Sequence, residues 1–578
     1  MSIVFKELKR YWKQLILLVL AVFGTTLTTM GLPALMKNLI DYSIPEKDTA
    51  SVWATTGIMI ILVIVEIVLG IATAKLAAGI SMGIGRDLRQ KVFDKVQGFS
   101  QAEIDKLTTS SLITRTNSDI SQIQLFFSQC LNIAVMAPLM CIVGMALALG
   151  TSPSLSSILI LSIPLMAIII VIIGKVAIPL SEKIQKKLDS INMIIREKLT
   201  GTRVIRAFGT TKFEENRFND INVEYTGMNK KLQNVTALLL PAVILVLSAT
   251  VAGVMLLAYR DSVTGGAEHT TGEVMTMVQY VMLILASVIM LTIVFLMLPR
   301  AATSAKRVKE VLVSKNLIQD AENPQDNTEK QGYLEFKNVS FTYAGSDVPA
   351  IKGLSFKAAP GETTAIIGGT GMGKSTIINL IPRLYDVTEG QVLVDGIDVR
   401  DYKLDVLRNK IGFVPQKASL FKGTIDSNIA FGADNPTEDR IETAVKIAQS
   451  YDFVTAKEDG FASPVAQGGS NFSGGQKQRL CIARAIVRKP EIYVFDDSFS
   501  ALDFKTDRVL RSALKAETDN ATTIIVAQRI STIMEADRII VVEKGEIAGI
   551  GTHKELLKNC DVYKEIAQSQ LSKEELEK

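Results

Sequence analysis

The chain has 578 residues, which is too long for one ordinary domain, and 48% of them are apolar. Its formal net charge of +4 is small for this length and does not indicate a nucleic-acid partner. The four cysteines occur without a CxxC pair or a neighbouring His/Cys cluster, which favours buried thiols over a metal site or a disulfide framework.

Six apolar runs in the first half each approach the ~20 residues that a helix needs to cross a bilayer. Basic residues precede the first run and fill the segments after the second and fourth, so the positive-inside rule predicts that these parts are cytoplasmic. Both segments have helical periodicity. We expect the spans to continue into the cytoplasm, with tips near 111–119 and 203–214 that could dock on an ATPase domain; a separate small domain is the less favoured alternative. The runs cover residues 15–36, 52–75, 131–149, 155–176, 236–258 and 274–298.

Polar residues inside the apolar runs are costly in a membrane and need a reason. Glu66, near the middle of the second run, either faces a central cavity that attracts cationic substrates or pairs with a polar group on a neighbouring helix. Gln279 and Tyr280 in the sixth run either line the same path or join helices together. Four prolines are candidates for helix kinks: Pro33, Pro138, Pro164 and Pro241.

The segment GGTGMGKS, residues 368–375, is a complete phosphate-binding loop. It follows a short apolar strand and precedes a helix, which is the context that separates such a loop from a chance match. Backbone N–H groups suit phosphates, Lys374 reaches the β- and γ-phosphates, and Ser375 offers a hydroxyl to magnesium. The candidate nucleotide-binding residues are Gly368, Gly369, Thr370, Gly371, Met372, Gly373, Lys374, Ser375 and Thr376.

Four further elements fit a nucleotide site. Asp496 ends an apolar strand and is the expected carboxylate for magnesium. Tyr343, upstream of the phosphate loop, is placed to stack on adenine, and Gln416 after another strand can approach magnesium or water. A second anion site, which has no lysine, lies at the start of a later helix. Without a lysine it cannot easily hold ATP alone, but it can complete a nucleotide pocket on a partner. Its residues are Ser473, Gly474, Gly475 and Gln476.

Together these motifs are spaced like those of the nucleotide-binding domain of ATP-binding cassette (ABC) transporters. The six apolar runs and two long inner segments resemble the exporter type, in which one membrane domain is fused to one ATPase domain. The resemblance covers essentially the whole chain. It implies an α-helical transmembrane bundle with cytoplasmic extensions at 1–315, a linker at 316–332 and an α/β P-loop nucleotide-binding domain at 333–578.

The resemblance also implies cofactors and an assembly. The cofactors are ATP and Mg2+, with Ser375, Gln416 and Asp496 at the metal. In that family two chains pair head to tail, and each ATP lies between one chain's phosphate loop and the other chain's SGGQ helix. By analogy the protein is a multi-pass protein of a bacterial plasma (inner) membrane, with its N-terminus and ATPase domain in the cytoplasm.

Two candidate catalytic positions depart from the family pattern. Asp497 stands where the family has a glutamate that orients the attacking water, and Gln528 stands where it has a histidine at the γ-phosphate. A carboxylate withdrawn by ~1.5 Å loses reach to that water, and small misplacements can cost ~100-fold in rate. The two histidines, His269 and His553, are not placed to substitute.

The SGGQ element is intact, so the chain resembles the degenerate-site subunit of heterodimeric bacterial multidrug exporters. That resemblance implies a second, homologous half-transporter as partner, a small amphipathic drug-like or lipid-like substrate, and ATP hydrolysis by the assembled translocase at the partner's site. Two alternatives remain open. One is an ATP-gated regulatory or channel-like protein, and the other is a homodimeric exporter with slow turnover.

Overall fold

The computed structural model describes residues 2–264, 268–325 and 330–571, and the chain divides into two compact units. One unit comprises Met1–Gln97 and Ser110–Ser314, and the other comprises Gly98–Thr109 and Lys315–Lys578. Residues 265–267, between the fifth and sixth predicted runs, and residues 326–329 of the predicted linker lie outside the described residues.

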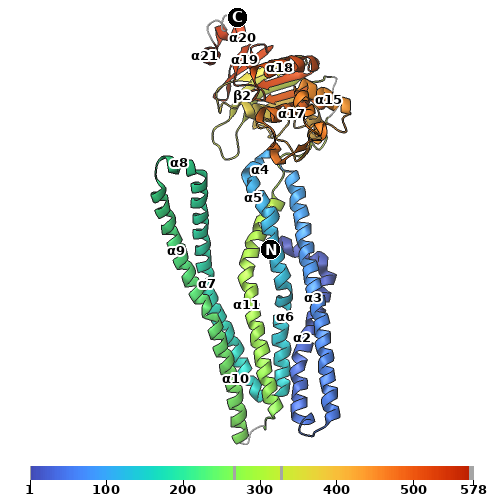
Figure 1. Cartoon of the computed structure of the whole chain (residues 1–578), viewed down its shortest axis with the longest axis vertical. Coiled ribbons are helices and arrows are strands. Elements are labelled where there is room, and N and C mark those ends of the chain that lie inside the picture. Colours follow the sequence, from blue (N-terminus) through green and yellow to red (C-terminus); the bar gives the residue numbers. More distant parts are fainter. Residues whose placement is uncertain (1, 265–267, 326–329, 572–578) are drawn as a thin grey trace. The chain divides into compact units, whose positions relative to one another are not determined.

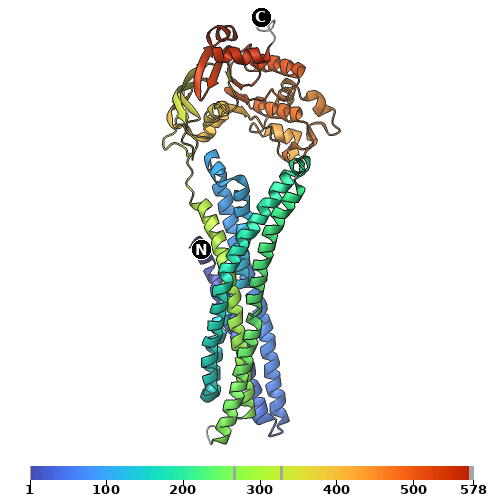
Figure 2. The same ribbon diagram turned by 90° about the vertical axis from the view of Figure 1, so that its left-hand side faces the viewer.

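The first unit is a bundle of long helices (Figure 1, Figure 2). Six helical segments among the described residues are long and apolar enough to cross a membrane, and each contains one of the six predicted runs. The elements are α1 (Ser2–Leu8), η1 (Lys9–Tyr11), α2 (Trp12–Asn38), η2 (Leu39–Ser43), α3 (Thr49–Gln97), α5 (Thr109–Thr114), η3 (Arg115–Asp119), α6 (Ile120–Thr151), α7 (Pro153–Thr200), α8 (Thr202–Ala207), α9 (Thr211–Ala237), α10 (Leu239–Val263) and α11 (Thr271–Val313).

The helices extend well beyond the apolar runs, as predicted, but one tip is misplaced. After α3 the chain turns at α4 (Gln101–Leu107), so the prediction of a tip near 111–119 is wrong. A capping box explains the turn: the Ser100 side chain caps the α4 backbone, and the Glu103 carboxylate accepts from the Ser100 N–H at 2.7 Å. The second tip contains α8 and overlaps the predicted 203–214.

Pro241 has the largest effect among the four prolines. A proline has no N–H to donate to the carbonyl four residues earlier, which here belongs to Ala237. The helix stops at that residue, and the chain resumes as α10 at Leu239. The other three prolines lie inside the continuous helices α2, α6 and α7.

Side chains from α2, α6, α7, α10 and α11 form the core of the helical unit, with Met30, Tyr280 and Ile284 fully buried. By contrast, α3 leaves a row of large apolar side chains exposed, among them Ile60, Ile64 and Ile67. Exposed apolar surface of this extent is typical of a helix that faces lipid.

The second unit is an α/β domain built on two main sheets. One is a four-stranded antiparallel sheet in the order β2-β1-β4-β5, and the other is six-stranded in the order β12-β11-β3-β10-β9-β6, with β7 and β8 forming a separate pair. The strands are β1 (Leu334–Phe341), β2 (Ile351–Ala358), β3 (Thr363–Ile367), β4 (Glu389–Val394), β5 (Ile397–Asp398), β6 (Ile411–Val414), β7 (Gly423–Thr424), β8 (Pro464–Val465), β9 (Ile492–Asp496), β10 (Thr522–Val526), β11 (Arg538–Glu543) and β12 (Glu546–Gly551).

The second unit also contains helices. They are α4, α12 (Lys374–Leu380), α13 (Leu404–Asn409), α14 (Ile425–Ala430), α15 (Glu438–Ile447), α16 (Tyr451–Thr455), η4 (Gly460–Ala462), η5 (Gln467–Gly469), α17 (Gly474–Val487), α18 (Phe504–Glu517), α19 (Ile530–Ile533), α20 (His553–Asn559) and α21 (Asp561–Gln570). The short α4 joins this unit through side chains: the Tyr385 hydroxyl donates to Asp105 at 2.6 Å, and the Leu317 N–H donates to Glu103 at 2.6 Å.

Sheet topology decides where the functional loops lie. The neighbours β11, β3, β10, β9 and β6 run parallel, so their carboxyl ends share one edge. Loops that follow the carboxyl ends of parallel strands form the usual ligand site of an open α/β sheet. The phosphate loop after β3 and the predicted site residues after β6, β9 and β10 all leave the sheet at this edge.

Candidate functional site

The phosphate loop connects β3 to α12, as predicted, and its glycines are required by geometry. Gly373 has φ of +93°, and a Cβ there would lie 2.6 Å from the Ala350 carbonyl oxygen. A Cβ on Gly368 would lie 2.2 Å from the Val542 carbonyl oxygen. A side chain at either position would force the backbone apart, so the loop keeps a tight cradle of N–H groups at the start of α12.

Lys374 lies inside this cradle. Its ammonium group donates to the carbonyls of Gly368 and Gly369 at 2.8 and 2.7 Å, and only 9% of the residue is exposed. Burial lowers the pKa of the Lys374 ammonium, while the carboxylates of Asp497 and Asp496 act to raise it. A largely desolvated cation whose hydrogen bonds go to neutral loop carbonyls is suited to an anionic group such as a phosphate.

The two adjacent acids differ in their surroundings. Asp496 ends β9, is 7% exposed, and accepts from the Ser375 hydroxyl at 3.3 Å. Burial raises the pKa of Asp496, and the neighbouring Asp497 carboxylate acts in the same direction. Burial also raises the pKa of Asp497, against hydrogen bonds from Ser500 and Gln416. Gln416, which follows β6, therefore lies at the same acidic site.

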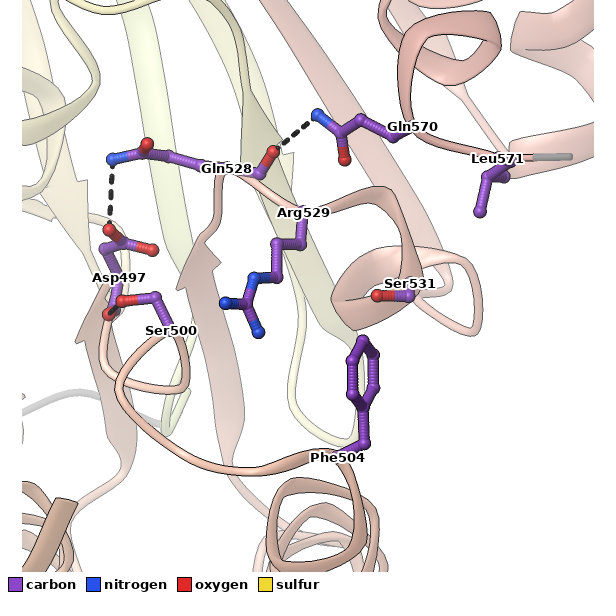
Figure 3. Close-up of a pocket in the computed structure, with 8 residues that line it drawn as sticks. All are labelled: Asp497, Ser500, Phe504, Gln528, Arg529, Ser531, Gln570 and Leu571. Carbon is purple, nitrogen blue, oxygen red and sulfur yellow. Dashed lines mark hydrogen bonds between the residues drawn. The ribbon is translucent and has the colours of Figure 1, made fainter.

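Asp497 contacts the other departing residue directly. The Gln528 side-chain amide donates to the Asp497 carboxylate at 3.0 Å, as Figure 3 shows. Asp497 adopts φ of +47°, and its N–H donates to the Val526 carbonyl at 2.9 Å, so its backbone is fixed to β10. The Asp497 carboxylate, held by this backbone, therefore points at the side-chain amide of Gln528.

The cavity beside this contact has a volume of about 580 Å³. Ser500 closes one side of it by donating to the Asp497 backbone carbonyl at 2.9 Å, while Phe504, which is 74% exposed, stands at another side (Figure 3). The lining residues are Asp497, Ser500, Phe504, Gln528, Arg529, Ser531, Gln570 and Leu571. It is an open cavity of mixed polar and apolar lining at the carboxyl edge of the parallel strands.

Tyr343 follows β1 and is one of three aromatic residues in contact. Its ring lies edge-on to Phe341 and Tyr385, with centroids 4.8 and 5.5 Å away. Its hydroxyl is 2.9 Å from the hydroxyl of Thr376 on α12, next to the phosphate loop. The residue is 37% exposed, which leaves part of its side chain accessible for stacking on a base.

The SGGQ element lies elsewhere in the unit. Ser473 is the N-cap of α17, and it forms a capping box with Gln476: the Gln476 N–H donates to the serine hydroxyl at 3.3 Å, and the Ser473 N–H donates to the Gln476 side chain at 3.0 Å. The serine is exposed and Gly474 has open space around it. These hydrogen bonds stay within the first turn of α17.

The polar residues predicted in the membrane runs lie in the first unit. Glu66 accepts from the Thr29 hydroxyl on α2 at 2.8 Å. Tyr280 is fully buried in the helical core, and its hydroxyl is 3.4 Å from the Met30 carbonyl oxygen; Gln279 is partly buried. His553 lies in the second unit. It is buried against α21, and its Nδ1 is 2.6 Å from the Tyr563 hydroxyl.

Two contacts of the site were not anticipated from the sequence. Tyr385 brings Asp105 of α4 next to the aromatic group around Tyr343. Gln570, at the end of α21, contacts the backbone of the loop that carries Gln528. Both contacts join residues far apart in the sequence, and neither Tyr385 nor Gln570 belongs to a recognisable motif. Only the capping box at Ser100 could have indicated α4.

Comparisons with known proteins agree with this architecture. Residues 15–294 match the family model of the ABC transporter transmembrane region, and residues 351–500 match the model of the ABC transporter ATPase family, described as "ABC transporter". An "Uncharacterized ABC transporter ATP-binding protein" of Mycobacterium tuberculosis (strain CDC 1551 / Oshkosh) is 37% identical over 98% of this chain and 97% of its own length. The "ATP-dependent lipid A-core flippase" of Mannheimia succiniciproducens is 30% identical over 94% of this chain and 93% of its own.

The fold has a close counterpart among solved structures. A bacterial Atm1-family ABC exporter with ATP bound superposes with a TM-score of 0.80 at 26% identity, covering 98% of this chain and 99% of that one. The chain therefore belongs to the ABC transporters. It is an exporter-type half-transporter, a multi-pass membrane protein in which a helical transmembrane domain is fused to an ATP-binding α/β domain.

Proposed function

We propose that this chain is one subunit of a heterodimeric, ATP-driven exporter of amphipathic drug-like or lipid-like compounds. In this proposal its own ATP site holds nucleotide and hydrolyses it poorly, while its SGGQ element completes the hydrolytic site of the partner. The domains are those expected above: 1–315 as the transmembrane domain with its extensions, 316–332 as linker, and 333–578 as the ATPase. The N-terminus and the ATPase face the cytoplasm of a bacterium.

The observation that carries the proposal is the contact between Asp497 and Gln528. A hydrolytic site needs a group that orients water in line with the γ-phosphate. Here the acid is one methylene short, and the neighbouring side chain donates to its carboxylate at 3.0 Å. Gln528 cannot take up or release a proton as a histidine can, so both departures favour retention of ATP over its cleavage.

The residues present fit the magnesium that accompanies ATP. Asp496 is a buried carboxylate with a raised pKa and has Ser375 as a neutral donor at 3.3 Å, so a divalent cation would relieve its desolvation. Ser375, Asp496 and Gln416 offer only oxygen ligands, which suit this ion. When bound, magnesium would neutralise phosphate charge. Lys374 and the loop N–H groups would hold the phosphates, and Tyr343 would stack on the base.

The transport side of the proposal rests on similar proteins and on polar residues in the helices. Two similar proteins, one described as a flippase and one as an exporter, favour transport over an ATP-gated channel. Glu66 and Gln279 are the proposed polar points of a substrate path. For Glu66, the bond from Thr29 leaves its second carboxylate oxygen for a ligand. Tyr280 is fully buried among helices and would act by shaping that path.

The test compares two variants of the tagged chain isolated with its partner from its own membranes. Ser473→Ala should strongly reduce ATPase activity of the complex, because the partner's site loses its signature serine. Asp497→Asn should change activity little, because that site contributes little turnover. Ser470→Ala, an exposed serine in the same loop, is the matched control. Equal losses from Ser473→Ala and Asp497→Asn would reject the division of labour and favour a slow homodimer.

A further inference from the structure

The end of the C-terminal helix contacts the loop that carries Gln528. Gln570 is the last residue of α21, and its side-chain N–H donates to the Gln528 backbone carbonyl at 2.9 Å (Figure 3). Its side-chain oxygen accepts from the Ile530 backbone N–H at 2.9 Å. One carboxamide thus bonds the backbone on both sides of Arg529. Since it uses a donor and an acceptor at once, it fixes the direction of the loop as well as its distance.

The helix that presents Gln570 is firmly packed. Tyr563 and Ala567 of α21 are fully buried in the larger core of the ATPase unit, and Tyr563 is bonded to His553 at 2.6 Å. Ile566 and Leu571 pack against the same core. Gln570 is therefore held by a fixed element one turn beyond a buried anchor, not by a loose terminus.

These contacts form a continuous chain to the acidic site. α21 holds the Gln528 backbone through Gln570, and the Gln528 side chain donates to Asp497 at 3.0 Å. The Asp497 N–H is in turn fixed to β10 at 2.9 Å. Gln570 and Leu571 also line the cavity beside Asp497. The loop is also anchored by Ala527 and Ile530, which are buried in the same core on either side of it, so the Gln570 carboxamide holds the exposed part between them.

We propose that Gln570 is a positioning residue of this nucleotide site. By fixing the backbone of the loop that carries Gln528, it orients the Gln528 side chain toward Asp497. In this way α21 contributes to the retention of nucleotide. The consequence for ATP retention rests on the proposed function, in which this site holds ATP. A purely structural role is the competing explanation, because the Ile530 N–H is an end group of α19 that needs a partner.

Two substitutions separate these roles. Gln570→Glu keeps an acceptor for the Ile530 N–H but loses the donor to the Gln528 carbonyl. It therefore preserves the cap of α19 and removes the contact that orients Gln528. Gln570→Leu removes both bonds at similar volume. Gln568→Ala changes an exposed glutamine on the same helix and is the matched control.

The experiment measures nucleotide release from this chain in the isolated complex. The complex is loaded with 8-azido-ATP labelled on the α-phosphate, chased with unlabelled ATP, and photolysed at increasing times; the label on this chain is then counted after gel separation. Both Gln570→Glu and Gln570→Leu should speed release about fivefold, the effect of losing one neutral hydrogen bond. Gln568→Ala should match the wild type.

Two results would overturn the proposal. One is unchanged release in both variants, and the other is faster release in Gln570→Leu alone, together with a lower unfolding temperature, which indicates a cap only. The α-label stays on the nucleotide whether or not the γ-phosphate is cleaved. A failure here is therefore distinguishable from a failure of the proposed function, which is judged by phosphate release.

Discussion

Restoring the two departing side chains should restore hydrolysis at this site. The variant carries Asp497→Glu together with Gln528→His. The first change moves the carboxylate outward by ~1.5 Å, and the second removes the amide that lies 3.0 Å from it in the wild type. Because a misplacement of ~1 Å can cost ~100-fold, we expect turnover to rise by about 100-fold, or ~2.7 kcal/mol of activation free energy. The intact Ser473–Gln476 segment lets two copies complete each other's sites.

The assay is phosphate release by the purified chain in lipid nanodiscs at saturating magnesium and ATP, in preparations whose dimeric state is verified by light scattering. Asp519→Glu, the same change at an exposed position of the ATPase unit, is the control and should have no effect. ATP affinity should stay within about twofold, since neither change touches the phosphate loop. If the double variant binds ATP as a dimer but turns it over no faster than the wild type, the reasoning about carboxylate reach is refuted.

Three further predictions concern the ATPase unit. Tyr343→Ala should weaken ATP binding about tenfold in calorimetry, because base stacking contributes ~1–3 kcal/mol, while Tyr343→Phe should bind nearly as well as the wild type. Asp497→Asn should raise the thermal midpoint of the nucleotide-free protein at pH 8. Burial raises the pKa of this acid, so its ionised form is penalised in the fold above that pKa, and the gain should fade as the pH falls toward ~4. Lys410→Met should lower the midpoint by about 10 °C, because it leaves the fully buried Asp395 carboxylate, 2.9 Å away, without its cation at a cost of ~3–5 kcal/mol.

The sequence predicted the parts of this molecule that depend on local patterns. Six apolar runs of bilayer length became six long helices, because in lipid a helix is the simplest way to satisfy every backbone group. The phosphate loop was predicted with its strand and helix, because its glycines are needed at fixed positions; Gly373 has the positive φ that only glycine adopts easily. The family assignment followed from these motifs and is confirmed.

Features that depend on long-range contacts were missed or left open. The prediction for the first helical tip was 111–119, whereas the chain turns at α4; both stretches are polar and helical, and only the Ser100 capping box distinguishes them. Two explanations of Glu66 were equally compatible with the sequence, and the bond from Thr29 becomes visible only when α2 and α3 are packed. Gln570 belongs to no motif, so its contact with a loop 42 residues away could not have been expected.

The most direct test of the account is the initial rate of phosphate release from the purified wild-type chain with no partner present. The account predicts a rate far below the ~1 s⁻¹ that marks the lower end of typical enzyme turnover, with bound nucleotide recovered mainly as intact ATP. A lone chain that releases phosphate at ~1 s⁻¹ or faster would contradict it, because Asp497 and Gln528 would then form a competent hydrolytic site.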